Sequence, residues 1–574
     1  MRISFEKHPL RWVSMTAMAL VLLCFIAVGL TGCIGLPAQV ARTATYSLAA
    51  NQDTTLGKLV QIRRAAKRVT SESGFSLLDR VDQAYAARMA LIDAAQRSLD
   101  LQYYAIHADP STEALLQRLR AAAQRGVRVR ILLDDFNAVG PDAQVLRLAF
   151  ERNIEVRLFN PLPGSRSSGL GRVIGSLNDV NRIQKRMHNK LFIADNAMGI
   201  TGGRNLGDAY FGQSVDSNFV DLDVLAAGSI VRDMSASFDR YWNDPLAYPA
   251  QALLKSDELD ALREAAKPGL DGAAPNMSSV AGAAWMAGSK TAVLPDVSPT
   301  AVVAPIFNLQ QMTLTWAPAL LMVDKPGKLA PDDEEAAAGD TLIDGLLQLM
   351  GQAKQDVLIV SPYFVPGAPM MKTFAQLRAR GVRVRVLTNS LASSDAPLAH
   401  AGYARYRKAL LGLGVELHEL HVAQIAKNGA KTGMVGSGGS KTGSGGVSGS
   451  GTNPGIGSGA GSGAKSRASL HAKAVIIDSR LAVIGSMNLD LRSQLKNSEV
   501  ALLIRSTSLS RQASQQVTNT ITQGAYRVEM SGDALVWRAP AGADYPDATS
   551  EPDAGFRQKM MVNVLGPFAP DEML

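Results

Sequence analysis

A His-x-Lys-x4-Asp motif occurs twice in this chain of 574 residues. The six motif residues, all candidate catalytic residues, are His188, Lys190, Asp195, His471, Lys473 and Asp478. An imidazole titrates near neutral pH, so it can act as a nucleophile when neutral and as an acid when protonated. Two such rings suit cleavage of one phosphodiester, in which one histidine attacks phosphorus and the other protonates the leaving alkoxide. The lysines would offset charge on the non-bridging oxygens, and this chemistry requires no metal or other cofactor.

Polar residues downstream of the two motifs repeat as well. Asn205 and Asn488 follow the two histidines at the same offset, and Ser486 lies shortly before Asn488. We expect these three side chains to donate hydrogen bonds to the substrate phosphate. Further along, Asp223 and Glu499 are acidic residues at equivalent strand positions in the two halves, where a surface salt bridge is the alternative to a role in the site.

The motif spacing predicts a strand that carries both His and Lys. Residues i and i+2 of a strand point to the same face, so each His projects beside its Lys. The apolar runs 191–194 and 474–477 are typical of the buried continuation of that strand. Asp195 and Asp478 then fall on turns, a position that favours a role in local geometry over chemistry.

An internal repeat surrounds the motifs and organises the chain. Residues 125–135 read Arg-Gly-Val-Arg-Val-Arg-Ile-Leu-Leu-Asp-Asp, and residues 380–390 read Arg-Gly-Val-Arg-Val-Arg-Val-Leu-Thr-Asn-Ser. Each copy is a predicted strand that follows a predicted helix, at 112–124 and 370–379, and an earlier strand, at 98–105 and 356–364. Further strands are expected at 154–159 and 415–420. A strand, helix, strand order indicates parallel pairing in an α/β domain, once in each half.

The repeat and the composition predict the domain boundaries. The expected segments are a signal or lipoprotein segment at 1–33, a first domain at 75–250, a connector at 251–340, a second domain at 341–530 and a C-terminal extension at 531–574. Within the second domain, residues 428–466 are dominated by Gly and Ser, the composition of a flexible linker, and are expected to carry no chemistry.

Composition indicates the class of binding partner and the cellular compartment. With 59 Lys and Arg against 51 Asp and Glu, the net charge of +8 favours an anionic partner such as a phospholipid surface or nucleic acid. The two cysteines, Cys24 and Cys33, both lie in the N-terminal apolar segment, which excludes a disulfide framework. His418 and His421 lack clustered ligands, so we expect no metal site there.

The N-terminal segment has the features of an export signal. Positive charges precede an uncharged run at 12–30, which is followed by Leu-Thr-Gly-Cys ending at Cys33. This quartet resembles the lipobox of bacterial lipoproteins, which implies lipidation of Cys33 and a chain anchored in the cell envelope that faces the periplasm. The alternative is an uncleaved transmembrane anchor, for which 13–30 is nearly long enough.

The two motifs, together with stretches at 101–104, 202–211, 360–366 and 485–490, resemble the phospholipase D superfamily and its bacterial cardiolipin synthase C-like subgroup. The resemblance covers nearly the whole chain after the N-terminal segment and implies two tandem phospholipase D-like α/β/α domains related by pseudo-twofold symmetry, with the motifs meeting at their interface. It implies that His188 is the nucleophile and His471 the general acid, although the reverse assignment stays open. By the same resemblance, Asp223 and Glu499 are candidates to orient the imidazoles.

The activity implied by the resemblance is phosphatidyl transfer that makes cardiolipin from phosphatidylglycerol and a second phospholipid, with phosphatidylethanolamine as a candidate donor. The partners are therefore membrane phospholipids, and no nucleic acid is expected. Hydrolysis of the phospholipid uses the same chemistry with water as acceptor, so it stays open as an alternative. Cleavage of nucleic acid is a weaker alternative, since the predicted anchor favours a lipid substrate. A non-catalytic module is disfavoured because both motifs are intact.

Overall fold

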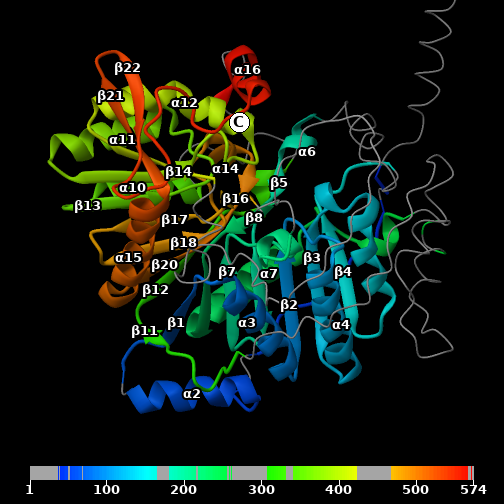
Figure 1. The fold of residues 1–574 in the computed structure, drawn as a ribbon. Coiled ribbons are helices and arrows are strands. Elements are labelled where there is room, and N and C mark those ends of the chain that lie inside the picture. The colour runs from blue at the N-terminus through cyan, green and yellow to red at the C-terminus, as the bar shows by residue number, and fades with distance from the viewer. Residues whose placement is uncertain are drawn as a thin grey trace, which may run out of the picture.

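Two nine-stranded sheets, one from each half of the chain, form the protein in the computed structural model (Figure 1). The described residues are 36–37, 39–49, 52–67, 69–164, 180–214, 217–254, 258, 260, 307–330, 341–422, 467–565 and 570–571. The predicted signal segment 1–33 with Cys33, and the Gly/Ser segment 428–466, lie outside them. Over the described residues, the helices are all too short or too polar to cross a bilayer.

Each half contains the predicted strand, helix, strand unit with parallel pairing. The first comprises β2 (Ser98–Tyr103), α4 (Pro110–Gln124), β3 (Arg128–Asp134) and β4 (Ile154–Phe159). The second comprises β13 (Asp356–Val360), α11 (Gly367–Ala379), β14 (Arg383–Asn389) and β15 (Glu416–Leu420). Ser98 is opposite Arg128, and Asp356 is opposite Arg383, so the repeated sequences take the same register. The predicted α/β fold and its duplication are confirmed.

Local sequence explains these units. The Asp109 side chain accepts the N–H of Thr112 and caps α4, whose first residue is Pro110. Gly126 and Gly381 follow the helices with φ of 95° and 78°, a conformation that glycine adopts without strain. Both helix ends thus return the chain to the sheet at the same point.

The remaining strands extend each sheet on both sides. The first sheet has the order β10-β4-β3-β2-β6-β7-β9-β1-β11, and the second β12-β20-β18-β17-β13-β14-β15-β21-β22. Further strands of the first sheet are β1 (Ser73–Leu78), β6 (Leu191–Ala194), β7 (Met198–Gly202), β9 (Asp223–Gly228), β10 (Ala247–Pro249) and β11 (Thr315–Trp316). Those of the second are β12 (Ala319–Val323), β17 (Ala474–Ile477), β18 (Leu481–Gly485), β20 (Val500–Arg505), β21 (Ala525–Ser531) and β22 (Ala534–Arg538). When the second order is read in reverse, its strands from β15 to β20 correspond one by one to the strands from β4 to β9 of the first.

Helices complete the layers on the sheets. In the described part of the chain, the remaining α-helices are α2 (Thr55–Lys67), α3 (Val81–Ala94), α6 (Val180–Gln184), α7 (Ser229–Trp242), α10 (Leu342–Gly351), α12 (Pro397–Gly412), α14 (Leu491–Leu495), α15 (Thr507–Gly524) and α16 (Phe556–Leu565). Short 3-10 turns are η1 (Asp135–Asn137), η2 (Gly140–Phe150), η3 (Asp208–Tyr210), η4 (Ala250–Ala252) and η5 (Pro326–Leu329).

The predicted connector is part of both sheets. β11 pairs with β1 at the edge of the first sheet, and β12 pairs with β20 at the edge of the second. At the other end, β21 and β22 continue the second sheet past residue 530. The sheets therefore extend beyond the expected boundaries of 75–250 and 341–530. β11 and β12 are edge strands, whose pairing with distant residues leaves little local signal.

One hydrophobic core joins the two halves. It contains Leu191, Val224 and Trp242 of the first half together with Ile476 and Leu502 of the second, all buried. Separate cores lie beneath the helices on the far side of each sheet. Because the halves share a packed core, their relative position is set as firmly as packing within one domain.

Candidate active site

Each motif His and Lys lies between two strands, not within one. His188, Asn189 and Lys190 follow the short strand β5 (Arg186–Met187) and precede β6, and the second motif lies in the same way between β16 (Arg467–Leu470) and β17. The prediction of one continuous strand was therefore wrong at this point. The reason is that the chain changes partner here, since β6 and β17 pair within the large sheets whereas β5 and β16 pair with the opposite half.

Two short parallel ladders connect the halves, and β5 and β16 of these ladders lie near one another in the middle of Figure 1. β5 pairs with β19 (Asn497–Ser498), and β16 pairs with β8 (Ser217–Val220). The backbone N–H of His188 donates to the Ser498 carbonyl at 3.0 Å, and that of His471 donates to the Val220 carbonyl at 2.8 Å. The residues that follow these two carbonyls are Glu499 and Asp221. Each ladder thus brings a histidine of one half next to a carboxylate of the other.

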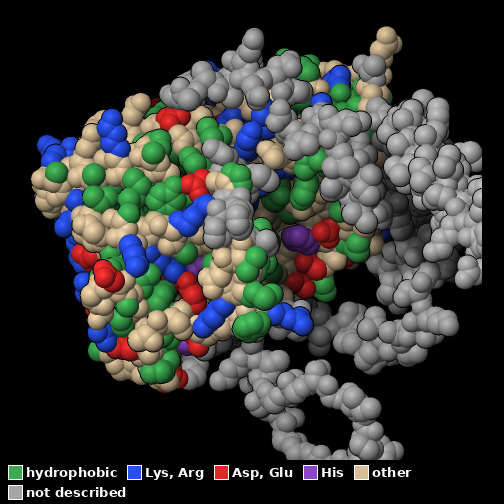
Figure 2. Space-filling view, turned by 90° about the horizontal axis from the view of Figure 1, so that it is seen from above, with side chains coloured by type: hydrophobic (Ala, Val, Ile, Leu, Met, Phe, Trp, Pro, Cys, Tyr) green, Lys and Arg blue, Asp and Glu red, His purple; other side chains and the backbone are tan. Residues whose placement is uncertain are grey.

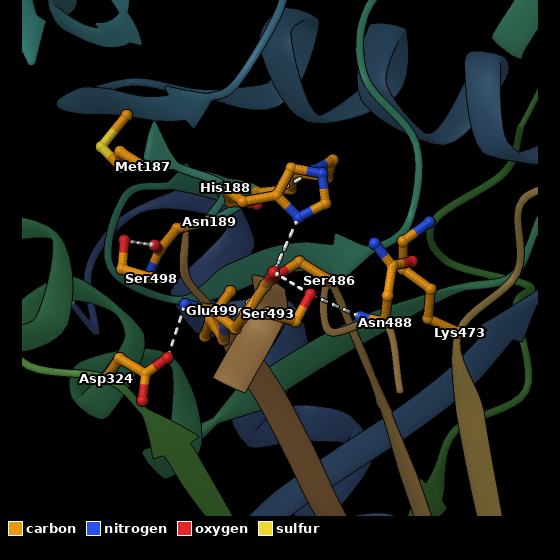
Figure 3. A network of polar contacts seen from close by, with 12 residues as sticks. Met187, His188, Asn189, Asp324, Lys473, Ser486, Asn488, Ser493, Ser498 and Glu499 are labelled. Carbon is orange, nitrogen blue, oxygen red and sulfur yellow. Dashed lines mark hydrogen bonds and ion pairs between the residues drawn. The ribbon is translucent and has the colours of Figure 1, made fainter. Parts of the chain in front are cut away.

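The histidine and carboxylate pairs are exchanged between the halves. Nδ1 of His188 lies 2.9 Å from a Glu499 carboxylate oxygen, and Nδ1 of His471 lies 2.7 Å from Asp221 Oδ2. The first pair is drawn in Figure 3. A carboxylate that holds Nδ1 fixes the tautomer and the ring orientation, so Nε2 is the nitrogen that can react.

Glu499 was an expected orienting residue, but the expectation for Asp223 is corrected by the structure. Asp223 Oδ2 lies 3.0 Å from Arg88 and 3.2 Å from Arg204, and all three side chains are buried. Its carboxylate therefore neutralises two core guanidinium groups, whereas Asp221 binds the imidazole of His471. The alternation of side chains along a strand cannot show which of Asp221 and Asp223 binds the histidine, because residues i and i+2 lie on the same face.

Gly203 has a role that sequence analysis missed. A Cβ at this position would lie 2.2 Å from Asp221 Oδ1, so only glycine leaves room for the orienting carboxylate. At the matching position of the second motif stands Ser486, whose hydroxyl donates to Glu499. A Gly-Gly pair after the first motif and a Gly-Ser pair at the matching place after the second are the sequence signal that could have indicated this role.

Two serines and the connector support Glu499. The Ser493 hydroxyl donates to Oε1 at 3.0 Å, and the Ser486 hydroxyl donates to Oε2 (Figure 3). The backbone N–H of Glu499 donates to Asp324 at 3.0 Å, and Asp324 is paired with Lys328 at 2.8 Å. Ser486 was predicted to donate a hydrogen bond to the substrate phosphate. In the structure its hydroxyl instead donates to the orienting carboxylate of Glu499.

The two predicted asparagines have different surroundings. Nδ2 of Asn205 donates to the Tyr210 hydroxyl at 2.9 Å, and its Oδ1 accepts the N–H of Ala105. Asn488 lies beside Lys473 in Figure 3, and its buried Oδ1 has no hydrogen-bond partner. Of the two side chains, Asn488 therefore has the freer amide.

Both lysines are buried behind their histidines. Nζ of Lys190 donates to the His188 carbonyl at 2.9 Å, and Nζ of Lys473 donates to the His471 carbonyl at 2.7 Å. Burial, followed by the nearby Lys473 cation, lowers the pKa of Lys190 to about 7, and burial also lowers the pKa of Lys473. An anion bound between the lysines would favour their charged forms, so the site is electrostatically suited to a phosphodiester.

Burial acts on the histidines in the same direction. It lowers the pKa of His188 to about 4 against the attraction of Glu499, and it lowers the pKa of His471. Burial alone would raise the pKa of Asp221, but the hydrogen bond and charge of His471 hold it at about 2. Both imidazoles are thus neutral near pH 7 before substrate binds, while Asp221 is ionised.

Aromatic rings pack against both histidines. The ring of Tyr104 meets His188 at a centroid distance of 5.2 Å, and Tyr210 and Phe219 meet His471 at 5.3 Å and 4.8 Å. These contacts restrict the imidazole planes and supply low-dielectric walls, in which charge interactions with a phosphate are stronger than in water.

The motif aspartates lie on the far side of the hairpins from the histidines. Asp195 accepts the N–H groups of Gln96, Arg97 and Ser98 at 2.7 to 3.1 Å. Asp478 accepts those of the three equivalent residues before and at the start of β13. Both residues have positive φ, 53° and 52°, at the turns that were predicted. Their contacts tie each motif hairpin to the start of the central strand, which corrects their assignment as catalytic residues.

We expect Asp195→Ala to destabilise the fold by about 3 kcal/mol, because three backbone N–H groups lose a charged acceptor at a buried site. Asp478→Ala is the matched control with a smaller expected loss, since the N–H groups of Lys354 and Gln355 are exposed to water. Urea unfolding measures the free energy, and kcat of the folded enzyme is expected to change less than about twofold. A large loss of kcat at unchanged stability would show that Asp195 takes part in the reaction.

Three other histidines, His107, His400 and His421, have partners other than the motif residues. Nδ1 of His107 lies 2.9 Å from Asp142, and His421 stacks on Tyr545 at 3.8 Å. His400 forms a cluster with Glu419 and Glu551 whose spacing would admit a metal ion, but Arg407 donates to all three side chains. The cluster is therefore already balanced by a guanidinium cation.

Comparison with known proteins relates the chain to one family. The family model described as "Cardiolipin synthase, PLD-like domain" matches residues 89–242, 346–453 and 457–521. Cardiolipin synthase C of Escherichia coli (strain K12) is 34% identical over 461 residues, which cover 80% of this chain and 87% of that protein. An uncharacterized protein of Helicobacter pylori is 30% identical over 92% of this chain and 94% of its own length.

Among solved structures, the phosphatidylserine synthase of Haemophilus influenzae Rd KW20 aligns with a TM-score of 0.49 and 13% identity, over 81% of this chain and 92% of that one. The family model covers more than half of the chain, in both halves and around both motifs. The chain therefore belongs to the cardiolipin synthase family of the phospholipase D superfamily.

Proposed function

We propose that this protein is a phosphatidyltransferase that makes cardiolipin from phosphatidylglycerol and a second phospholipid through a phosphohistidine. The observation that carries the proposal is the pair of histidines, each held at Nδ1 by a carboxylate of the opposite half and each backed by a buried lysine. Two imidazoles held in this way can divide the work of one cycle, with one attacking phosphorus and the other transferring the proton.

The proposed reaction has two displacements at the same phosphorus. In the first, Nε2 of His188 bonds to phosphorus, the bond to the head-group oxygen breaks, and His471 gives that oxygen its proton. In the second, a hydroxyl of phosphatidylglycerol loses its proton to His471 and bonds to phosphorus, and the phosphorus to nitrogen bond of His188 breaks. The proton count closes over the cycle, and Lys190 and Lys473 offset the charge on the non-bridging oxygens.

The assignment of His188 as nucleophile is supported by its ionisation. A pKa near 4 keeps this imidazole neutral at physiological pH, as attack on phosphorus requires. His471 must instead become protonated in the complex, and Asp221, with a pKa of about 2, is the ionised partner that stabilises its imidazolium. The negative phosphodiester raises the pKa of both lysines and of His471 on binding.

The proposal includes a place in the cell. Lipidation of Cys33 would anchor the protein in the bacterial envelope with both domains in the periplasm, where phospholipid head groups are abundant. The sequence supports this through the charged and apolar export signal that precedes the Leu-Thr-Gly-Cys quartet. An anchored enzyme meets its lipid substrates at high effective concentration.

We expect vesicles of phosphatidylglycerol, with or without phosphatidylethanolamine, to yield cardiolipin and glycerol or ethanolamine, with unchanged rates in EDTA. Lipid chromatography and assay of the released alcohol measure both products. Phosphatidic acid as the main product would show that water is the acceptor and the enzyme a hydrolase. Cleavage of DNA without lipid turnover would refute the proposal, and loss of activity in EDTA would refute the histidine-only mechanism.

A further inference from the structure

Helix α16 (Phe556–Leu565) carries an outward apolar stripe. Phe556, Met560 and Val564 are spaced four residues apart and are 80%, 51% and 57% exposed. Residues at this spacing lie on one face of a helix. These are three of the nine large hydrophobic residues that stand exposed in the described part of the chain, so the stripe is a concentration of apolar surface on a single short helix.

The opposite face of α16 holds the helix on the second domain. Val562 is buried against Leu391 and Ala401. Beside this small core, the Gln558 amide donates to the Leu391 carbonyl at 3.3 Å. The apolar stripe is therefore not the packed face of the helix, and burial of α16 in its own domain does not account for it.

The segment beneath α16 leads directly to the site. Asn389, at the end of β14, binds both the N–H and the carbonyl of Leu470, the residue before His471, at 2.8 and 2.9 Å. Leu391 follows Asn389 by two residues and contacts α16. In Figure 1, α16 lies at the upper end of the molecule and α2 at the lower end, and Figure 2 looks down on that upper face. One short segment thus links the helix to the second catalytic motif.

The charges of α16 indicate what kind of partner surface would cover the apolar stripe. Its sequence, Phe-Arg-Gln-Lys-Met-Met-Val-Asn-Val-Leu, includes Arg557 and Lys559 and no acidic residue. An exposed apolar stripe flanked by cations can insert into the interface of an anionic bilayer, where lipid phosphates attract the cations.

We propose that α16 docks the protein on an anionic phospholipid bilayer and so holds the histidines next to the head groups. The expected effect of docking on turnover rests on the proposed function. The docking itself does not require turnover. Partial insertion of the three side chains removes apolar surface from water, and Arg557 and Lys559 interact with lipid phosphates.

The test uses the full chain with vesicles of phosphatidylglycerol and phosphatidylethanolamine, and follows hydrogen exchange of the peptide that covers α16. We expect vesicles to protect this peptide in the wild type and not in the variant F556S/M560S/V564S. The matched control is I62S/L320S, which removes two residues that are 67% and 59% exposed on α2 and β12 and should retain the protection. Because the readout is local to α16, an N-terminal lipid anchor does not mask the result.

Turnover gives the second measurement. The triple serine variant is expected to lose at least about tenfold in cardiolipin formation at limiting vesicle concentration, and to keep wild-type turnover of a short-chain phosphatidylglycerol below its micelle concentration. Wild-type protein without vesicle-induced protection of α16 would overturn the docking proposal. Protection that rises with protein concentration in the absence of vesicles would also overturn it, in favour of contact with a second copy. Protection without cardiolipin from either substrate would instead leave docking intact and refute the proposed reaction.

Discussion

Replacing either His188 or His471 by alanine is expected to lower cardiolipin formation by at least about 10³-fold, while the protein stays folded. Each imidazole has a separate task in both displacements, so one histidine cannot replace the other. The measurement is product formation in vesicles, together with thermal unfolding followed by circular dichroism. His107→Ala is a matched control, because His107 is paired with Asp142 in a partly exposed position and should retain nearly full activity.

The two histidine variants also test the assembly of the site from both halves. Glu499 and Asp221 stay buried after their partners are removed, so a modest loss of stability is expected in each variant. Near wild-type activity in either variant would contradict a mechanism that uses both motifs. Equal loss in both, at similar stability, would support it.

Asp221→Asn and Asp223→Asn are expected to impair different properties, activity and stability respectively, although the two residues are separated by a single leucine. Asp221→Asn should lower kcat by about 10²-fold or more with little change in melting temperature, because His471 loses the carboxylate that holds its tautomer and stabilises its imidazolium. Asp223→Asn should lower the free energy of unfolding by about 3 to 5 kcal/mol, because Arg88 and Arg204 then keep uncompensated buried charge.

The pH profile separates a positioning role of Asp221 from a merely structural one. The general acid must be protonated, so activity falls as pH rises through the pKa of His471 in the complex. Loss of the adjacent carboxylate lowers that pKa, and the alkaline limb of the profile of Asp221→Asn should therefore move to lower pH. A profile that keeps its shape, or a kcat loss in Asp223→Asn with unchanged stability, would contradict the assignment.

Much of the fold could be predicted from the sequence because its signals are local. The parallel units around β3 and β14 follow from alternation of Val and Arg after an amphipathic helix, and the turns at Asp195 and Asp478 follow from residues that tolerate positive φ. The edge strands β11 and β12 were missed because their two to five residues gain their stability from partners far away in the chain.

The sequence by itself determined the duplicated α/β architecture, the candidate catalytic histidines and lysines, and the candidate carboxylate Glu499, since motif spacing and periodicity are properties of neighbouring residues. Only the tertiary structure decided that Asp221 and not Asp223 binds His471, that Ser486 supports Glu499, and that the motifs lie between strands. The pairing of Asp221 with His471 and the position of the motifs depend on the register of two short parallel ladders, beside which the paired residues are 250 and 311 positions apart. The partner in each ladder is selected by the packing of one half against the other.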